Sequence, residues 1–354
     1  MQMKATGFRE RRPVRVWTLR CLAAAAFLVM MGGVRGMAQT DGAEAEGEST
    51  IEQRFNIRSK TLGGRQFWGD VLYFRGWRIQ HNVLTGHHRL LDPDDVRHAW
   101  GSLAACTSRL KQIKASQSLP PMEGRAVIVI HGIVRSSKSF DALRKALLED
   151  DCTVVGFDYP STRVTIEESA EYLHHVIESL EGIDQIDLVV HSMGGLIVRT
   201  YLAKHSDPRL HRMVMLGVPN LGANMANIVQ MNPLFRLVFG PAGQQLIVDP
   251  EGFIAELPTP EFEFAVIAGA KGTDGGWNPL LEGDDDGTVE VSNTRLPGAV
   301  DFMTVESLHS FLMGHEEVIA ATVRFLRSGA LRESGVREPI ARSDDVGRAT
   351  ITDQ

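Results

Sequence analysis

Short apolar runs alternate with amphipathic stretches over the C-terminal two-thirds of the chain. Residues 126–130 are apolar at every position, as expected for a parallel strand covered on both faces. Comparable runs recur at 153–157, 186–189, 213–216, 264–268 and 302–305. Between them lie amphipathic stretches, one opened by the capping box Thr165 to Glu168, and 318–326 gives a last helix. The alternation predicts an α/β fold with a mostly parallel, doubly wound sheet and helices on both faces.

The run 186–189 leads into Val190-His191-Ser192-Met193-Gly194 and then into a helical stretch. Strand, sharp turn and helix is the layout of a nucleophile elbow, which exposes a serine hydroxyl at the edge of the sheet. Gly194 supplies one small residue that such a turn needs, but Val190 stands where the G-x-S-x-G pattern has its first glycine. Ser192 is the candidate nucleophile, and an ordinary glycine-containing turn is the alternative.

A serine nucleophile needs a base, and the chain has 12 histidines. His309 follows the last predicted strand and precedes the last helix, where catalytic groups of such sheets gather. We therefore predict His309 as the base in preference to His315, which falls in the first turn of that helix. His131 and His191 are expected to lie beside the serine and to shape the pocket.

The carboxylate that orients the base is sought in Gly283-Asp284-Asp285-Asp286-Gly287-Thr288-Val289, after the run 264–268. A calcium-binding EF-hand loop does not fit, because the twelfth position counted from Glu282 is Asn293 instead of Glu. Asp286 directly precedes the point where the chain turns back into the fold, so its side chain is expected to face inward. A solvated turn is the alternative.

The order Ser192, Asp286, His309 is that of α/β-hydrolase triads. From about residue 125 to 327 the chain resembles the lipase-like branch of that superfamily, which includes bacterial triacylglycerol lipases and inositol-deacylase-like proteins. The resemblance is carried by His131-Gly132-Ile133, His191-Ser192-Met193-Gly194-Gly195, Gly217-Val218-Pro219-Asn220, Asp286-Gly287-Thr288-Val289 and His309-Ser310-Phe311-Leu312. Val190 departs from it, as does Leu221, where such lipases often have His.

The resemblance implies a serine hydrolase of carboxylic esters that forms an acyl-enzyme, with Ser192 as nucleophile, His309 as base and Asp286 as orienting acid. It also implies an oxyanion hole formed by the backbone N–H groups of Ile133 and Met193. No metal or organic cofactor is expected. The alternatives are an acyltransferase or amidase with the same three residues, and an inactive binding member of the fold.

Residues 220–258 interrupt the alternation within the predicted hydrolase domain, 121–328. They are rich in Met, Phe and Leu and poor in charge, which predicts a helical cap lined for acyl chains. An ordinary pair of packed helices is the alternative. The expected partner is a small-molecule or lipid ester, and transient contact with a membrane or lipid surface is compatible with it.

Residues 51–120 match no known motif and are expected to pack on the core. Their stretch 67–91 is β-prone or mixed, and Asp92-Pro93-Asp94 is expected to start a helix that runs to about Lys114. Trp68, Trp77 and Trp100 are expected in the hydrophobic core.

The two ends of the chain differ from the rest. Residues 1–38 combine a basic start, an apolar run and a small-x-small cleavage pattern, which predicts a signal peptide and export to the periplasm or medium. An uncleaved membrane anchor is the alternative. We expect a flexible linker at 39–50 and a disordered tail at 329–354.

Composition narrows the function further. With 43% hydrophobic and 23% charged residues the chain can bury a large core. Its formal charge is −7, and removal of the basic leader would make it about −13, which disfavours a nucleic-acid partner. Cys106 and Cys152 lie outside the leader and are expected as buried free thiols, although one disulfide is compatible with export.

Overall fold

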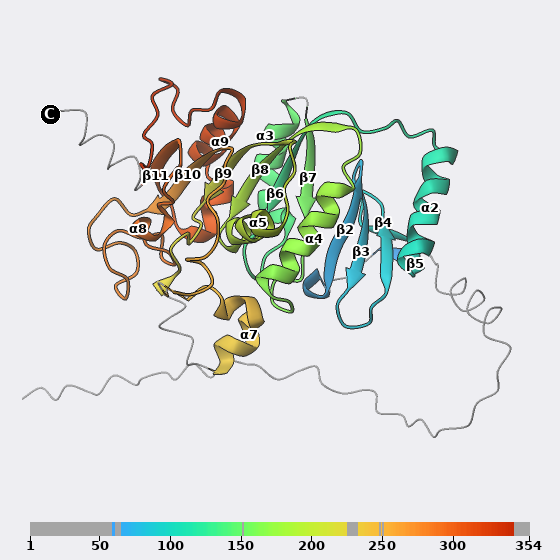
Figure 1. Ribbon diagram of the computed structural model, residues 1–354, viewed down its shortest axis with the longest axis horizontal. Helices are drawn as coiled ribbons and strands as arrows, with labels where there is room; N and C mark the ends of the chain where they lie inside the picture. Colours follow the sequence, from blue (N-terminus) through green and yellow to red (C-terminus); the bar gives the residue numbers. More distant parts are fainter. Residues whose placement is uncertain are drawn as a thin grey trace, which may run out of the picture. The chain divides into compact units, whose positions relative to one another are not determined.

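The computed structural model describes residues 59–60, 65–150, 152–224, 233–247, 249 and 251–342. The predicted leader, the linker and part of the predicted cap lie outside these ranges. The described chain contains a six-stranded parallel sheet and a five-stranded antiparallel sheet (Figure 1).

The parallel sheet is the centre of the fold. Its strands are β6 (Gly124–Ile130), β7 (Thr153–Phe157), β8 (Ile183–His191), β9 (Leu210–Leu216), β10 (Glu263–Ala270) and β11 (Asp301–Glu306). Their order in space is β11-β10-β9-β8-β6-β7. The chain runs from β6 to β7 on one side and returns to β8 on the other, so the carboxyl ends of β6 and β8 flank a topological switch point, where α/β sheets bind ligands.

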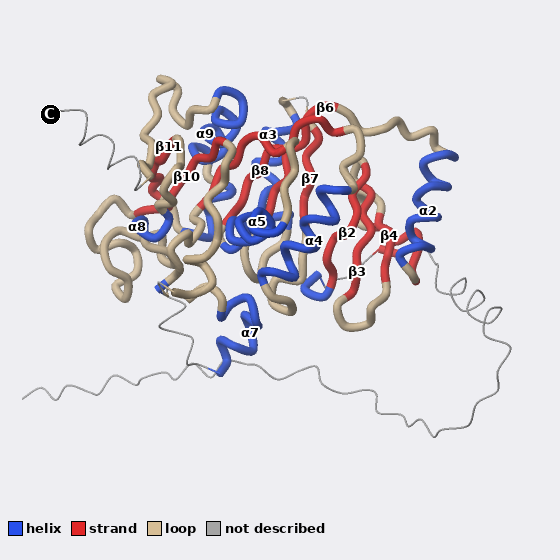
Figure 2. Tube along the Cα trace, viewed as in Figure 1, coloured by secondary structure: helices blue, strands red, loops and turns tan. Residues whose placement is uncertain are grey.

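Helices cover both faces of this sheet, as Figures 1 and 2 show. Val127 and Val129 point into the core shared with α3 (Asp141–Leu148) and α9 (Glu316–Ser328). Ile128 and Ile130 point into the core shared with α4 (Ile166–Glu178) and α5 (Met193–Lys204). Burial on both faces explains why β6 is apolar at every central position. The predicted α/β fold with a doubly wound sheet is confirmed.

The N-terminal sheet has the order β1-β5-β4-β3-β2 and is antiparallel. Its strands are β1 (Ser59–Lys60), β2 (Trp68–Phe74), β3 (Trp77–Asn82), β4 (His88–Leu91) and β5 (Val96–Gly101). A short 3-10 helix, η1 (Arg65–Phe67), precedes β2. Of the three tryptophans expected in the core, Trp77 is buried, whereas Trp68 and Trp100 are half-buried.

The helix expected from residue 92 begins later. Asp92 accepts hydrogen bonds from two following backbone N–H groups, at 3.0 and 2.9 Å, and thereby forms a turn that leads into β5. The helix is α2 (Leu103–Ser116), capped by the hydroxyl of Ser102. Apolar residues at 96, 100 and 103 fit helical spacing, but the turn at Asp92 starts a strand. The prediction for 92–102 was therefore wrong.

The C-terminal tail is packed further than expected. Leu331 is fully buried, and its N–H donates to the carboxylate of Asp301 at 2.8 Å. Arg332 pairs with the same carboxylate at 2.8 Å, and the N–H of Ile340 donates to the carbonyl of Ala299 at 2.9 Å. The predicted disorder is therefore wrong for 329–342, because residues of this segment provide hydrogen-bond partners for the buried carboxylate of Asp301.

Shorter elements connect the main ones. They are η2 (Ser137–Phe140), α7 (Pro233–Gln244), α8 (Val291–Thr294) and η3 (His309–Gly314). Cys106 and Cys152 are both buried and form no disulfide, so the expectation of two buried thiols is confirmed. No helix in the described ranges has the length and apolarity needed to cross a bilayer.

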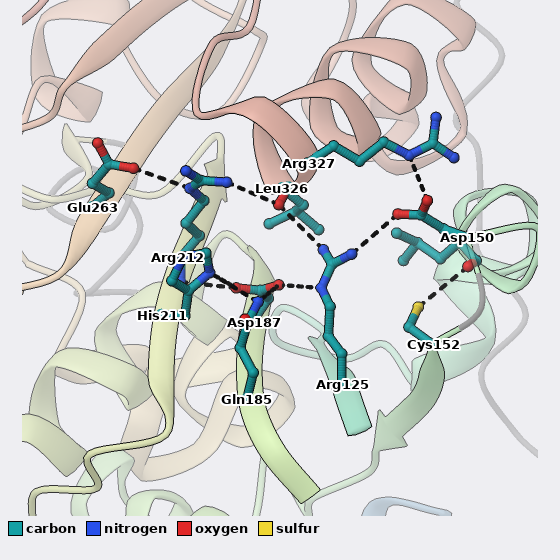
Figure 3. A network of polar contacts seen from close by, with 11 residues as sticks. Arg125, Asp150, Cys152, Gln185, Asp187, His211, Arg212, Glu263, Leu326 and Arg327 are labelled. Atoms are coloured by element: carbon teal, nitrogen blue, oxygen red, sulfur yellow. Dashed lines mark hydrogen bonds and ion pairs between the residues drawn. The ribbon is translucent and has the colours of Figure 1, made fainter. Parts of the chain in front are cut away.

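A network of charges lies near the amino ends of the strands (Figure 3). The fully buried carboxylate of Asp187 accepts from Arg125 Nε at 2.6 Å and from the N–H of Arg212 at 2.9 Å, and it lies 3.0 Å from His211 Nδ1. Arg125 also pairs with Asp150 at 3.1 Å. These ion pairs join β6, β8 and β9 at the end of the sheet opposite the switch point.

Candidate active site

Ser192 lies on a tight turn between β8 and α5. Its backbone has φ 54° and ψ −129°, a conformation that is strained for any residue with a Cβ atom. The N–H of Ser192 donates to the carbonyl of Leu216 on β9 at 3.0 Å. A Cβ atom at Gly194 would lie 2.6 Å from the carbonyl oxygen of Ile130, so only glycine fits there. The turn therefore holds the serine at the carboxyl edge of the sheet.

Val190 occupies the position of the missing first glycine. It is fully buried in β8, where it pairs with Ile130 on one side and Met215 on the other. The strand thus remains regular up to the turn, and the close approach of backbones falls on Gly194 instead.

The structure brings the three predicted side chains together. His309 Nε2 lies 3.0 Å from Ser192 Oγ, and His309 Nδ1 lies 2.7 Å from Asp286 Oδ2. The backbone N–H of His309 donates to the carbonyl of Asp286 at 2.8 Å, which fixes the ring from a second side. With its proton on Nδ1 and donated to Asp286, the imidazole presents Nε2 as an acceptor for the serine hydroxyl. This geometry can remove the hydroxyl proton.

The loop around Asp286 fixes this carboxylate. Asp286 Oδ1 accepts two backbone N–H groups, at 3.0 and 2.8 Å, so that Oδ2 faces His309. Asp285 is also buried, but its carboxylate accepts backbone N–H groups of the surrounding loop, as does that of Asp284. Asp286 is thus the member of the acidic run that lies against the histidine.

The 131–137 loop follows β6 and passes beside Ser192. A Cβ atom at Gly132 would lie 2.9 Å from the Cβ of Ser192. In the described part of the chain the N–H groups of Ile133 and Met193 donate to no acceptor. Met193 is the first residue of α5, where N–H groups have no partner within the helix. Both N–H groups are therefore available to a negatively charged oxygen beside Ser192.

The neighbouring histidines contact the backbone of the site. His191 is completely buried, and burial lowers its pKa well below the usual range, so its ring is neutral at pH 7. Its Nε2 donates to the carbonyl of His309 at 3.0 Å. His131 stacks on Tyr159 at 4.2 Å, and its Nδ1 lies 2.7 Å from the carbonyl of Gly132. His315 is the N-cap residue of α9.

A cavity of about 400 Å³ opens at Ser192 and His309. Ile133, Phe239 and Leu246 give it an apolar lining, and the last two come from the predicted cap region. Among the described lining residues, Arg135 carries the permanent charge. The cavity can therefore hold an apolar group next to the serine hydroxyl, with a cation at its wall.

Arg199 on α5 was not anticipated from the sequence. Its guanidinium is buried and donates to the carbonyls of Asn220, Leu257 and Pro258 at 2.9, 2.6 and 3.1 Å. These carbonyls lie at the two ends of the predicted cap region, so one side chain joins both ends. Burial lowers the pKa of Arg199 to about 10, which leaves it charged at pH 7. An arginine within an otherwise apolar helical stretch is the signal that could have found it.

The described residues contain no group of three or more His, Cys, Asp or Glu side chains placed to hold a metal ion.

The strand order, the strained serine turn after β8 and the histidine after β11 define an α/β-hydrolase fold. The expected resemblance to lipase-like α/β-hydrolases is thus confirmed at the level of the fold. Residues 94–258 match a family model described as a domain of unknown function, DUF7379. No curated protein matches the chain.

Several solved structures are similar to this chain. The mature lipase BlEst2 of Bacillus licheniformis is 18% identical, over 59% of this chain and 89% of the lipase, with a TM-score of 0.43. A thermophilic esterase from Thermogutta terrifontis is 17% identical, over 58% and 91%, with a TM-score of 0.39. The phospholipase PlaB of Legionella pneumophila is 18% identical, over 48% of this chain and 45% of PlaB, with a TM-score of 0.39.

Proposed function

We propose that this protein is a serine hydrolase of carboxylic esters, of lipase or esterase type. The observation that carries the proposal is the unbroken chain of hydrogen bonds from Asp286 through His309 to Ser192, which ends at a cavity. A serine hydroxyl gains nucleophilic power only when a base takes its proton and a third group orients that base.

In the proposed reaction Ser192 Oγ attacks the ester carbonyl carbon while its proton moves to His309 Nε2. Asp286 Oδ2 accepts the hydrogen bond from Nδ1–H and stabilises the imidazolium that forms. The C–O bond to the alcohol then breaks, and the imidazolium gives its proton to the departing oxygen. Water attacks the acyl-serine by the same route, with His309 again as base, and releases the carboxylic acid.

The negative oxygen of each tetrahedral intermediate needs hydrogen-bond donors. The N–H groups of Ile133 and Met193 are proposed for this role, because both flank Ser192 and neither has an acceptor in the described part of the chain. Loss of one such donor costs about 10² to 10³ in turnover in serine proteases.

The cavity indicates the class of substrate. Its apolar lining from Ile133, Phe239 and Leu246 suits an acyl chain, and Met or Phe side chains in the predicted cap suit apolar ligands generally. We therefore favour esters of carboxylic acids with an apolar acyl group. Comparison of soluble esters with emulsified triacylglycerol separates esterase from lipase.

The test uses the full chain and p-nitrophenyl esters with acyl groups of two to sixteen carbons. We expect hydrolysis by the wild type and loss of about 10⁴-fold or more in kcat for Ser192→Ala. A fluorophosphonate probe should label the wild type and not the variant. Equal hydrolysis by the Ser192→Ala variant would contradict the proposal.

A further outcome concerns the acceptor. Addition of an alcohol or amine acceptor, with product analysis, shows whether water is the normal acceptor of the acyl group. Predominant transfer to the acceptor over water at low acceptor concentration would favour an acyltransferase that uses the same residues.

A further inference from the structure

We infer that the N-terminal sheet is part of the catalytic design, because it fixes the 131–137 loop that carries the proposed donor Ile133. Gln66 and Arg78 are the positioning residues. This inference rests on the proposed function. It assigns a role to a region that the proposed chemistry does not otherwise use.

The loop needs external support, because its backbone is strained. Val134 is a β-branched residue with φ 60°, a conformation that such residues adopt only when their surroundings impose it. The strained residue directly follows Ile133. A small relaxation at Val134 would therefore move the N–H of Ile133 relative to Ser192.

Gln66 supports the strained residue through one intermediate, and its Nε2 also makes a long contact with the loop by donating to the carbonyl of Arg135 at 3.5 Å. The N–H of Val134 donates to Ser161 Oγ at 3.1 Å, and the hydroxyl of Ser161 donates to Gln66 Oε1 at 3.1 Å. Thr162 Oγ1 donates to the same Gln66 oxygen at 3.2 Å. Ser161 is completely buried and Thr162 is buried, whereas Gln66 is half-buried. The amide oxygen of Gln66 thus orients the hydroxyl that holds Val134.

Arg78 supports the far end of the loop. The N–H of Ser137 donates to Asp158 Oδ1 at 2.7 Å, and Arg78 Nη1 donates to Asp158 Oδ2 at 3.2 Å. Asp158 is also fixed by its backbone, because its N–H donates to the carboxylate of Asp70 on β2 at 2.7 Å. Asp158 Oδ1 lies 3.8 Å from His131 Nε2, at the start of the loop.

Both supports reach the loop through the segment 158–162, which follows β7. They start from β2, from β3 and from η1, which precedes β2; β2 is the strand of the N-terminal sheet nearest to β7 in Figure 1. The hydrogen bonds are buried or part-buried and some are charge-assisted, so they are directional and strong compared with surface contacts. The arrangement predicts that the sheet affects the transition state, in which the oxyanion forms, more than the binding of the ester.

The test compares two variants of similar size at Gln66. Gln66→Met removes the oxygen that accepts from Ser161 and Thr162, and Gln66→Glu keeps an acceptor there. We expect Gln66→Met to lower kcat about tenfold to hundredfold with KM changed less than twofold, because misplacement of a catalytic group by about 1 Å costs about 10². Gln66→Glu should restore most of the rate. Gln112→Met, on the exposed face of α2, is the matched control and should behave as the wild type.

A second readout separates positioning from mere stability. A trifluoromethyl ketone forms a tetrahedral adduct with a serine, so its inhibition constant should rise in Gln66→Met by about the factor lost in kcat. Ser161→Ala should produce the same loss, and Gln66→Met combined with Ser161→Ala should cost no more than Ser161→Ala alone. If Gln66→Met does not fold, Ser161→Ala carries the test.

The outcomes are distinct. Unchanged kcat in folded Gln66→Met and Ser161→Ala, or a loss seen only in KM, would overturn the inference while the Ser192-dependent activity of the wild type stands. Additive losses in the double variant would also overturn it. Wild-type activity that does not depend on Ser192 would instead refute the proposed function.

Discussion

Asp187 and Asp286 are both buried carboxylates of the same sheet, one near the amino ends of its strands and one beyond their carboxyl ends. The carboxylate of Asp187 contacts protein groups that include the side chains of Arg125 and His211 (Figure 3). Asp286 begins a chain of hydrogen bonds that passes through His309 and stops at a hydroxyl on a cavity. A closed network stabilises, whereas an open chain can transfer a proton.

Backbone strain distinguishes the two ends in the same way. Ser192 and Val134, both beside the cavity, have positive φ values of 54° and 60°. The strands that carry Asp187 and its partners pair in parallel, with register shifts between Ile186 and Leu188 and between Gly124 and Arg125. Ser192 and Val134 are two of the five described non-glycine residues with positive φ, and both lie beyond the carboxyl ends of the strands.

The largest effect is expected from Asp286→Asn. The asparagine amide has no negative charge to stabilise the imidazolium, and it no longer fixes the tautomer with the proton on Nδ1 of His309. The kcat should therefore fall about 10⁴-fold, as for the equivalent change in serine proteases. The free energy of unfolding should change little. Ester hydrolysis and urea unfolding of the same sample check both statements.

The matched control is Asp284→Asn in the same loop, which should retain activity within about twofold, since Asp284 does not contact the histidine. Equal losses in the two variants would mean that loop structure, and not the carboxylate at His309, accounts for the effect.

Asp187→Asn should show the opposite behaviour. Breaking a buried ion pair leaves Arg125 and His211 without their shared carboxylate, so the free energy of unfolding should fall by about 3 kcal/mol. For a domain of this size that is a drop of roughly 10 °C in Tm. The kcat of the folded variant should stay close to that of the wild type.

Asp184→Asn, an exposed change on the same strand, serves as the control and should leave Tm unaltered. A large loss of kcat in folded Asp187→Asn would contradict the conclusion that Asp187 contributes to stability and not to catalysis.

A third buried carboxylate, Asp70, belongs to neither end and is expected to respond to pH. Burial raises its pKa to about 7, against the influence of nearby Arg78. Between about pH 4 and pH 7 the folded protein holds a proton that the unfolded chain has lost, so the free energy of unfolding should fall as the pH rises, and level off above pH 7.

Urea unfolding at pH 5 and at pH 8 measures this difference, and Asp70→Asn should reduce it. A variant with the same pH dependence as the wild type would assign the effect to other groups.

The smallest effect is expected at Arg135. At the amino end of the sheet Arg125 and Arg212 are paired with carboxylates. At the cavity, the guanidinium of Arg135 pairs with no carboxylate of the described residues. Arg135→Gln should therefore raise KM for an ester with a negatively charged acyl group, such as p-nitrophenyl monosuccinate, by about threefold at low salt.

The uncharged p-nitrophenyl butyrate is the reference substrate and should be unaffected. The difference between the two esters should shrink at high salt, because ions screen exposed charges. An equal change in KM for both esters would mean that Arg135 affects the shape of the cavity and not the binding of a negatively charged acyl group.

Much of the fold around the parallel sheet follows from the sequence. Continuous apolar runs such as 126–130 predict a buried parallel sheet, and the positions of Ser192, Asp286 and His309 after their strands predict that the three side chains meet. The structure places them within hydrogen-bond distance. Their catalytic roles stay predictions, as do those of Ile133 and Met193. The leader, the linker and residues 225–232 of the cap lie outside the described ranges.

The N-terminal sheet could not be derived in the same way. Its strands mix buried and half-buried positions without regular alternation and contain histidines and arginines, and the turn at Asp92 resembles a helix start. The supports for the 131–137 loop join residues 66 and 161, or 78 and 158. Such contacts depend on the packing of the two sheets, and local spacing carries no signal for them.

Arg199 has a consequence for engineering. Since one buried guanidinium binds the chain at Asn220 and again at Ile254, Leu257 and Pro258, redesign of the cavity wall at Phe239 or Leu246 should leave this arginine and the carbonyls it binds in place.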